Sequence, residues 1–473
     1  MSSGNTIKFG TDGWRARIAH DYTFENIRKV AKGISAYLHN HGLNKKSLIV
    51  GYDSRFASYE FASEVARITS AAGIHTLISE NIVPTPAVSY NILNNGAGAG
   101  IVITASHNSW EWNGLKFKPS FGGSAPPDVV AEIESLIENP LLDNLVPQKH
   151  IENYLPDLVD LKTPYLSKLS NSVNLRLIKE SGLRVLIDSM HGSGSGYLRS
   201  ILENSDTTIK EIRNDRNPIF PDMKQPEPIE QNLQPTIHII KNSNYDVALA
   251  NDGDADRLGV LDENGKYIDT LAIFSLLCLH QFEYRKQKGT IVRSITQSNM
   301  INKLANMYGS QVVTTPVGFK FLGPAMIEHD AIAAGEESGG YAFKGNIPER
   351  DGLLSGLLFL ELMALTGQRA SELVKYLHQK VGEHYYDRVD LVTETASKQL
   401  NLARFKESLP TSLGGLAVLE ANLTDGLLFS LENGFWGLIR QSGTEPLIRL
   451  YAEGDSPARV QEILTSLQDL IYH

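Results

Sequence analysis

Residues 98–119, GAGIVITASHNSWEWNGLKFKP, join an apolar run to a polar loop. The run from 98 to 103 predicts a buried strand, and the polar residues begin where that strand ends. In open α/β sheets, ligands bind beyond the carboxyl ends of the strands. Ser106 in this loop is therefore a candidate reacting group. The alternative is structural, with Ser106 or Asn108 capping the start of a helix.

The same plan recurs along the chain. A strand running into a polar loop is predicted again at 245–257, YDVALANDGDADR, and at 330–340, DAIAAGEESGG. Each of the three is preceded by another strand and loop, at 46–55, 182–196 and 289–299. Strands alternating with helical segments predict mainly parallel sheets covered by helices. We therefore expect three similar α/β domains, followed from about residue 385 by a smaller α+β domain that ends in a helix at 456–473.

Composition excludes several classes of protein. The chain has 473 residues and one cysteine, Cys278, so a disulfide framework and a cysteine-rich metal site are excluded. The longest apolar stretch, 353–367, is shorter than the roughly 20 residues that span a membrane, so it predicts a core helix. The first residues lack the pattern of a signal peptide. With a formal net charge of −10, we expect a cytoplasmic protein that binds neither membranes nor nucleic acid.

Three carboxylates alternate with small residues after the second strand, at Asp252, Asp254 and Asp256. At this spacing they can converge on one point, and oxygen ligands of this kind suit Mg²⁺ or Ca²⁺. A calcium-binding loop of the helix–loop–helix type needs glycine at its sixth position, where this chain has Arg257. A solvated acidic turn is the structural alternative. Arg257 favours a site, because a cation beside a metal helps to hold a phosphate.

Ser106 needs an activating group if it is to act as a nucleophile. Because neighbouring side chains usually point apart, we do not expect His107 to be that group, and the Gly-x-Ser-x-Gly elbow of hydrolases is absent. Another possibility is that Ser106 carries a phosphate shared with the metal of the aspartate triplet. Lys116, ten residues further on, is then a general acid or base, or a charge partner.

Two further loops carry polar groups suited to a phosphorylated sugar. In GEESGG, 335–340, carboxylate and hydroxyl oxygens suit neighbouring sugar hydroxyls, and an exposed acidic turn is the alternative. In IRQSGTEPLIRL, 439–450, two arginines flank a glycine turn, where backbone amides and guanidinium groups bind a phosphate dianion. A plain hairpin turn is the alternative there. HGSGSGY, 191–197, lacks the last glycine of a dinucleotide fingerprint and predicts only a strand–helix turn.

These loops, together with FGTDGWRA at 9–16, resemble the motifs of the α-D-phosphohexomutase superfamily, the phosphoglucomutases and phosphomannomutases, in the same order. The resemblance covers essentially the whole chain. It implies a heart-shaped, four-domain α/β architecture with three similar α/β/α domains and a smaller C-terminal α+β domain. The domains expected are 1–160 with the phosphoserine loop, 161–262 with the metal loop, 263–380 with the sugar-binding loop and 381–473 with the phosphate-binding loop.

The resemblance also implies roles for individual residues. Ser106 corresponds to the phosphoserine, and with the three aspartates it would ligate Mg²⁺. Lys116 and Arg15 are the implied catalytic groups for proton transfer or charge stabilisation. The implied substrate-binding residues are Arg257, Gly318, Lys320, Glu336, Ser338, Arg440, Ser442, Gly443, Thr444 and Arg449. The implied partners are sugar phosphates, with a hexose 1,6-bisphosphate as activator.

The chain departs from the superfamily pattern at three positions. Ser109 stands where proline is common, Ala16 where glycine is common, and Gly340 where many bacterial phosphomannomutases carry a histidine. The segment 315–326, TPVGFKFLGPAM, resembles glucose-type phosphoglucomutases. We therefore expect interconversion of hexose 1-phosphate and hexose 6-phosphate, with glucose favoured over mannose. A phosphoglucosamine mutase, a metal-dependent sugar phosphatase and a non-catalytic binding module are the alternatives.

Overall fold

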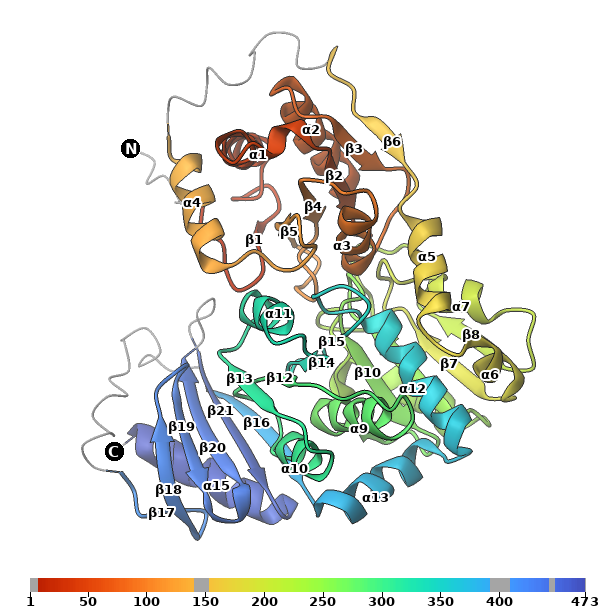
Figure 1. Cartoon of the computed structure of the whole chain (residues 1–473), viewed down its shortest axis with the longest axis vertical. Coiled ribbons are helices and arrows are strands. Elements are labelled where there is room, and N and C mark those ends of the chain that lie inside the picture. Colours follow the sequence, from red (N-terminus) through yellow and green to blue (C-terminus); the bar gives the residue numbers. More distant parts are fainter. Residues whose placement is uncertain (1–6, 140–152, 392–408, 442–446, 473) are drawn as a thin grey trace. The chain divides into compact units, whose positions relative to one another are not determined.

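The computed structural model describes residues 7–139, 153–391, 409–441 and 447–472 (Figure 1). The chain forms two compact units. The first unit comprises residues 1–268 and 338–370, and the second unit comprises residues 269–337 and 371–473. Within the described ranges, no helix is both long enough and apolar enough to cross a membrane.

The first sheet of the first unit has the strand order β1-β5-β4-β2-β3-β6. β2, β3, β4 and β6 run parallel, whereas β5 pairs antiparallel with both β4 and β1. The strands are β1 (Trp14–Arg17), β2 (Leu48–Tyr52), β3 (Thr76–Ser79), β4 (Ala99–Ile103), β5 (Trp112–Pro119) and β6 (Asp157–Val159). The strand predicted at 98–103 is thus confirmed as β4, at the centre of the sheet.

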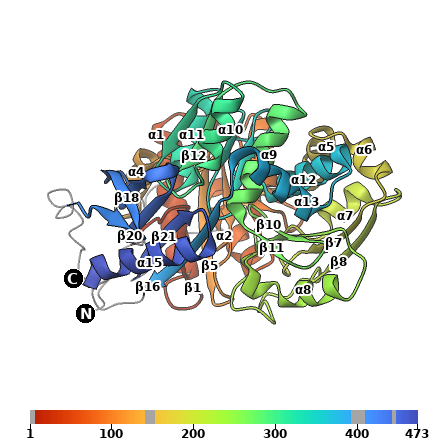
Figure 2. The ribbon, with the colours of Figure 1, turned by 90° about the horizontal axis from the view of Figure 1, so that it is seen from below.

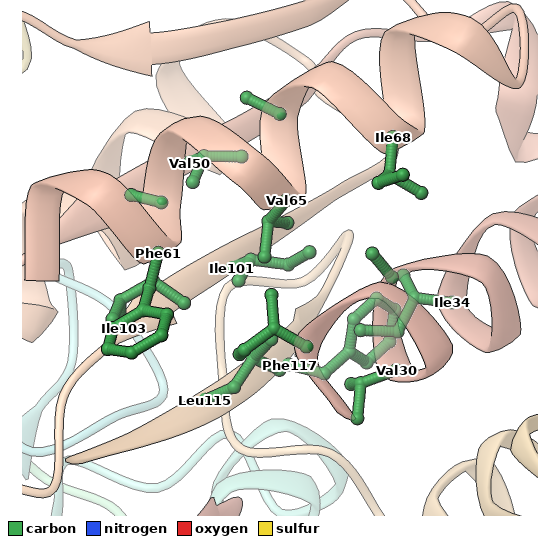
Figure 3. Packing of buried hydrophobic residues seen from close by; sticks show 14 of the residues in the cluster. Val30, Ile34, Val50, Phe61, Val65, Ile68, Ile101, Ile103, Leu115 and Phe117 are labelled. Carbon is green, nitrogen blue, oxygen red and sulfur yellow. The ribbon is translucent and has the colours of Figure 1, made fainter. Parts of the chain in front are cut away.

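Helices cover both faces of this sheet. They are α1 (Phe24–Asn40), α2 (Ser58–Ala71), α3 (Thr85–Asn94) and α4 (Pro127–Ile137). Alternate residues of β2 and β4, such as Val50 and Ile101, pack with α1 and α2 in one buried apolar cluster (Figure 3). The residues between them, Gly51 and Gly100, face Val88 of α3. The apolar packing on both faces fixes the direction in which β4 ends, and therefore the place of the loop that follows it.

The second sheet has the order β11-β10-β9-β7-β8. Its strands are β7 (Arg184–Asp188), β8 (Thr208–Ile212), β9 (Val247–Asn251), β10 (Leu258–Asp262) and β11 (Tyr267–Ile268). On β9, Ala248 and Ala250 pack in a cluster with Ile237 of α8 (Gln234–Lys241). Leu249, pointing the other way, lies near Gly356 of α12 (Gly352–Thr366). The apolar stretch that contains α12 is therefore a buried core helix, as predicted.

The second unit contains a parallel set of strands and an antiparallel sheet. β12 (Ile291–Ser294) pairs parallel with β13 (Val312–Thr315) and with β14 (Ala333–Gly335), accompanied by α9 (Thr270–Glu283), α10 (Met300–Met307) and α11 (Phe319–Glu328). Cys278 is buried in α9, as its apolar surroundings predict. The antiparallel sheet has the order β16-β21-β20-β19-β18-β17.

The antiparallel sheet packs on one C-terminal helix, α15 (Pro457–Tyr472), which lies against one face of the sheet (Figure 2). Its strands are β16 (Tyr385–Leu391), β17 (Ser412–Leu413), β18 (Leu416–Asn422), β19 (Leu427–Leu431), β20 (Trp436–Gln441) and β21 (Ile448–Gly454). The predicted small α+β domain with a terminal helix is thus confirmed. The remaining elements are β15 (Tyr341–Phe343), α5 (Lys162–Asn171), α6 (Leu175–Glu180), α7 (Tyr197–Leu202), α13 (Ala370–Val381), η1 (Leu43–Lys45), η4 (Glu230–Asn232) and η6 (Glu432–Gly434).

One expectation from the sequence needs correction. The first two sheets are mainly parallel, as expected, although the strand after each polar loop turns back antiparallel to the strand before it. For the same reason the helix-cap interpretation of Ser106 and Asn108 is wrong, since the loop leads into strand β5 and not into a helix. The strand–helix turn predicted at 191–197 is confirmed between β7 and α7. The boundaries at 160, 262 and 380 stay predictions.

Candidate active site

Ser106 lies in the loop between β4 and β5 with a left-handed backbone, φ 51°. Its amide N–H donates to Thr104 Oγ1 at 2.8 Å, which holds the turn. Its side-chain hydroxyl donates to Asp252 Oδ2 at 3.0 Å, and both side chains are buried. The structure therefore brings Ser106 and the first of the three aspartates into direct contact, although 146 residues separate them in the sequence.

His107 lies closer to Ser106 than the sequence suggests. The prediction that the two side chains point apart is wrong: Ser106 Oγ and His107 Nδ1 are 3.2 Å apart. The left-handed φ of Ser106 rotates its side chain toward its neighbour. Burial, and then the nearby guanidinium of Arg257, hold the pKa of His107 well below its ordinary value. In the described ranges no carboxylate contacts His107, so the third member of a hydrolase triad is missing.

The loop that carries the aspartates, residues 252–257, approaches the serine loop closely at Gly253. A Cβ atom at Gly253 would lie 2.5 Å from the carbonyl oxygen of Ser106, so only glycine fits there. The loop is also held by its own backbone, because Asp252 Oδ1 accepts the N–H groups of Asp256 and Arg257, both at 3.0 Å. β9 and β10 flank it, so the helix–loop–helix calcium motif is excluded, as predicted.

The three aspartate side chains are buried and converge. One carboxylate oxygen from each lies within 4.8 Å of the others. Over the parts of the chain that the structure describes, Asp254 Oδ1 and Asp256 Oδ1 have no hydrogen-bond donor. Burial, followed by the charges of Asp256 and Asp254, raises the pKa of Asp252 well above its ordinary value. Buried carboxylate oxygens without donors are unfavourable, so this group of ligands fits a hard divalent cation such as Mg²⁺.

Lys116 lies on β5, next to β4, the strand that precedes Ser106. Its side chain contacts aspartates of the loop after β9. Its ammonium is 2.7 Å from Asp12 Oδ2, 2.8 Å from Asp254 Oδ2 and 3.0 Å from Asp256 Oδ2. Burial alone would lower the pKa of Lys116, but these three carboxylates raise it instead. Lys116 is therefore a protonated donor in this arrangement. Asp254 Oδ2 also accepts the hydroxyl of Thr85 at 2.5 Å.

A second buried lysine and an arginine extend this ion-pair network. Lys118 contacts Glu349 Oε2 at 2.5 Å and Asp12 Oδ1 at 3.5 Å. Arg350 contacts Asp256 Oδ2 at 3.2 Å, Glu349 Oε1 at 3.2 Å, and Asp12. Asp12, Lys118 and Glu349 were missed from the sequence. The alternation of Lys116 and Lys118 on one strand face, and the position of Asp12 in FGTDGWRA, are the signals that could have identified two of them.

Arg257 completes the network with a contact to Glu227 Oε1 at 3.0 Å, and its Nε lies 4.0 Å from both Asp252 and Asp256. The ion pairs named here join six carboxylates to four cationic side chains, so acidic groups outnumber basic groups in this network. A divalent cation would add compensating positive charge. The acidic residues of the network are Asp12, Glu227, Asp252, Asp254, Asp256 and Glu349.

Arg350 occupies the space beside Gly340, the position without the expected histidine. A Cβ atom at Gly340 would lie 2.3 Å from Arg350 Cδ, so a larger residue there would displace the arginine. Gly340 thus allows Arg350 to reach Asp12 and Asp256. In this chain, therefore, a cation that contacts the metal loop takes the space beside Gly340.

Arg15 lies on β1, and its Nη1 donates to Asn108 Oδ1 at 2.7 Å, which ties it to the serine loop. It lines a cavity of about 380 Å³ together with the aromatic and basic residues Trp14, Arg17 and Trp112. Burial lowers the pKa of Arg15, while the nearby carboxylates of Asp12 and Asp254 act in the opposite direction. In the first unit, therefore, the structure brings together Arg15, Ser106, Lys116, Asp252, Asp254, Asp256 and Arg257.

The remaining predicted residues of the second unit form a separate group. The amide of Gly318 donates to Glu336 Oε1 at 2.7 Å. Asp425, which sequence reasoning missed, accepts the amide of Val317 at 2.8 Å and Arg440 Nε at 3.0 Å. Arg440 lies opposite Arg449 on the antiparallel strands β20 and β21, and the predicted turn between them lies outside the described residues.

Three of the predicted residues are placed as follows. Lys320, on α11, has its ammonium 5.4 Å from the centroid of the Phe321 ring. Ser338 is half-buried and belongs to the first unit. Arg449 Nε lies 3.7 Å from Asp390 Oδ2. Ser442, Gly443 and Thr444 lie outside the described residues.

Comparison with known proteins places these features in a family. The models of phosphoglucomutase/phosphomannomutase α/β/α domains I, II and III match residues 6–142, 163–265 and 269–381, and the model of the C-terminal domain matches residues 395–470. A phosphoglucomutase/phosphomannomutase of Thermococcus kodakarensis is 30% identical over 461 residues, covering 96% of each chain. A Methanosphaera stadtmanae protein assigned as a phosphoglucosamine mutase is 29% identical over 462 residues, covering 98% of this chain and 96% of its own.

Solved structures agree. A Thermus thermophilus protein assigned as a phosphomannomutase superposes with a TM-score of 0.86 at 30% identity, covering 100% of both chains. The four matched domains also confirm the predicted architecture of three α/β/α domains and a smaller C-terminal domain. The chain therefore belongs to the phosphoglucomutase/phosphomannomutase family of the α-D-phosphohexomutase superfamily, and it is a phosphohexomutase.

Proposed function

We propose that this phosphohexomutase interconverts hexose 1-phosphate and hexose 6-phosphate through a phosphoserine at Ser106 and a hexose 1,6-bisphosphate. The observation that carries the proposal is the contact of Ser106 Oγ with Asp252 Oδ2 at 3.0 Å, inside a network in which acidic groups outnumber basic groups. A phosphate on Ser106 would replace the hydroxyl hydrogen of this contact and bring a dianion beside a carboxylate. Such a pair is stable only if a cation lies between them.

Asp252, Asp254, Asp256 and the phosphorylated Ser106 are the proposed ligands of Mg²⁺. Asp254 Oδ1 and Asp256 Oδ1, which accept no hydrogen bond from the residues that the structure describes, support this ligand set. When bound, Mg²⁺ supplies Lewis-acid stabilisation of the charge on the transferring phosphoryl group. The protein side chains around the ligands then have to position the two oxygens that exchange the phosphoryl group, because phosphoryl transfer depends mainly on positioning and charge neutralisation.

In the forward reaction, the substrate's existing phosphate binds to Arg440, Ser442, Gly443, Thr444 and Arg449. Glu336 and Ser338 hold sugar hydroxyls, with Gly318 and Lys320 beside them and Arg257 near the transferring group. The substrate's O6 attacks phosphorus, the Ser106 Oγ–P bond breaks and an O6–P bond forms. The proton of the 6-hydroxyl leaves, and Ser106 Oγ gains a proton. Lys116 and Arg15 are the proposed groups for proton movement and charge stabilisation.

The bisphosphate then turns end for end. Its phosphate on O1 now lies at Ser106, whose hydroxyl attacks phosphorus, so that the O1–P bond breaks and the Oγ–P bond forms again. The hydroxyl proton of Ser106 leaves and O1 gains one. A bisphosphate that escapes before this second transfer leaves an enzyme without phosphate, so added hexose 1,6-bisphosphate is the proposed activator.

Glucose phosphate is the proposed preferred substrate, and the segment TPVGFKFLGPAM supports it. Glucosamine phosphate is the second candidate, because relatives at 26–29% identity are assigned as phosphoglucosamine mutases. The test compares glucose, mannose and glucosamine 1-phosphates in one coupled assay with Mg²⁺ and a trace of glucose 1,6-bisphosphate. The highest kcat/KM with glucose 1-phosphate supports the proposal, and a higher value with either other sugar contradicts the preference. Release of phosphate without formation of the 6-phosphate would instead identify a phosphatase.

Asp425→Ala is expected to raise the KM for hexose 1-phosphate about tenfold, with kcat little changed. Asp425 holds Arg440 Nε and the amide of Val317 at once, so it orients the proposed phosphate-binding arginine relative to the 317–320 segment. Losing a charge-assisted hydrogen bond costs about 1.5–3 kcal/mol of binding. Initial-rate kinetics over a range of hexose 1-phosphate concentrations measure both constants.

Two variants make that experiment decisive. Arg440→Ala removes the phosphate-binding group itself and should raise KM at least as much as Asp425→Ala. Asp455→Ala removes another aspartate, which is half-exposed and has its Oδ1 4.0 Å from Arg459 Nε. This variant should leave KM unchanged. An unchanged KM in both Asp425→Ala and Arg440→Ala would remove strands β20 and β21 from the substrate site.

A further inference from the structure

Arg55 lies in the loop between β2 and α2, and its side chain is completely buried. Its guanidinium donates to four backbone carbonyls of the serine loop. Nη2 donates to the carbonyls of Ser106 and Asn108, both at 2.6 Å. Nη1 donates to the carbonyls of Ser109 and Trp112 at 3.0 and 3.1 Å. A single side chain thus binds most of the turn between β4 and β5.

The guanidinium is itself held in place from other sides. Asp53 Oδ2 lies 3.3 Å from Arg55 Nε, and Asp53 Oδ1 accepts both the amide of Arg55 at 3.0 Å and the hydroxyl of Ser58 at 2.8 Å. The ring of Phe220 lies against the guanidinium, with 5.0 Å between the ring centroid and Cζ. Because Arg55 is fixed before it meets the loop, it can impose a conformation on the loop.

The serine loop needs such a partner. Ser106 adopts a left-handed backbone that is unfavourable for a residue with a Cβ atom. The turn also points several carbonyl dipoles toward one buried place, which is costly unless a donor satisfies them. A planar guanidinium has five N–H groups in a fixed geometry, whereas a lysine ammonium has three on a flexible chain. Arginine is therefore suited to this position in a way that lysine is not.

We propose that Arg55 is a positioning residue that keeps Ser106 Oγ within reach of Asp252 and keeps Asn108 in place to bind Arg15. Asn108 links the two effects, since its backbone carbonyl accepts from Arg55 and its side-chain Oδ1 accepts from Arg15 at 2.7 Å. Among the described residues, the bonds from Arg55 to the serine loop go to its backbone carbonyls and not to Ser106 Oγ, so Arg55 acts through the loop. The inference rests on the proposed role of Ser106.

The test is the variant Arg55→Lys. Lysine keeps the positive charge but lacks the two guanidinium nitrogens that donate to the loop carbonyls. We expect kcat for hexose 1-phosphate to fall about 100-fold, the effect of displacing a reacting group by roughly 1 Å, with KM within about threefold of the wild type. Hydrogen exchange of the amides in residues 104–112 should become faster. Incorporation of phosphate from glucose 1,6-bisphosphate, followed by intact mass spectrometry, should become slower.

Arg213→Lys is the matched control. Arg213 is a second well-buried arginine of the first unit, whose Nε donates to Asp188 Oδ1 at 2.8 Å and whose Nη2 donates to the carbonyl of Asn232 at 3.1 Å. It should lower the melting temperature by an amount similar to Arg55→Lys, while kcat and exchange in 104–112 stay near wild type. An equal loss of kcat in the control would mean that general destabilisation explains the effect, and the proposal would be wrong.

If Arg55→Lys does not fold, Asp53→Asn is the second variant that tests the proposal. Asparagine can still accept from the Arg55 amide and Ser58, but it loses the charge beside Nε, so kcat should fall by a smaller factor and loop exchange should rise. A folded Arg55→Lys or Asp53→Asn variant with wild-type kcat and wild-type loop exchange overturns the proposal. If the wild-type protein lacks mutase activity but Arg55→Lys still speeds exchange in 104–112, the proposed reaction fails while the positioning role stands.

Discussion

Ser106→Ala is expected to lose at least about 10³-fold in kcat, because Ser106 is the proposed phosphate carrier and removal of a covalent nucleophile costs up to roughly 10⁶-fold in other enzymes. The variant lacks the only oxygen of residue 106 that can carry the phosphoryl group. It also loses one hydrogen bond to Asp252, worth about 1 kcal/mol of stability, so the fold should persist. The coupled mutase assay measures the loss, and thermal unfolding checks that the protein is folded.

Thr85→Val is the control for Ser106→Ala. The hydroxyl of Thr85 also contacts the aspartate triplet, at Asp254 Oδ2, but it lies on α3 and outside the serine loop. If a hydroxyl near the triplet were enough, the two variants would behave alike. We expect Thr85→Val to keep kcat within about tenfold of wild type and to accept phosphate from glucose 1,6-bisphosphate, as the loss of one hydrogen bond predicts. Turnover by Ser106→Ala near the wild-type rate would refute the phosphoserine.

The parts of the site that follow strands could be predicted from the sequence. The run 98–103 and the run before Asp252 are apolar because both strands are buried on both faces, and polar residues begin where each strand ends. A local pattern of this kind predicts the strand, the residue at which it ends and the loop that follows. Ser106, the aspartate triplet and Lys116 can therefore be selected as candidate site residues without knowledge of contacts distant in the sequence.

The partners of those residues could not be predicted in the same way. The direction of the chain after Ser106 depends on pairing between β4 and β5, which a local pattern does not specify, so a helix cap was as plausible as a hairpin. Glu349 and Arg350 lie more than 230 residues from Lys118 and Asp12, and their ion pairs exist only after folding. The contact of Ser106 with His107 accompanies a left-handed φ at Ser106, which cannot be predicted from the residue types in this loop.

Lys116→Met is expected to lose about 10³-fold in kcat, because the proposed mechanism uses its ammonium for charge stabilisation and proton movement. The ammonium lies within 3.0 Å of Asp12, Asp254 and Asp256, so its removal leaves these buried carboxylates with less compensating charge. Breaking a buried ion pair from one side costs about 3–5 kcal/mol of stability. Because the triplet becomes more negative, Mg²⁺ should raise the melting temperature more in Lys116→Met than in wild type.

Lys118→Met separates these effects from simple loss of a buried lysine. Lys118 is two residues away on the same strand face and equally buried, and its partners are Asp12 and Glu349 rather than the aspartate triplet. It should cost a similar amount of stability, because it also leaves buried carboxylates without their cation. Its kcat should stay within about tenfold of wild type, and its gain in melting temperature with Mg²⁺ should match the wild type. Equal losses of kcat in the two variants would place the role of Lys116 in stability and not in the reaction.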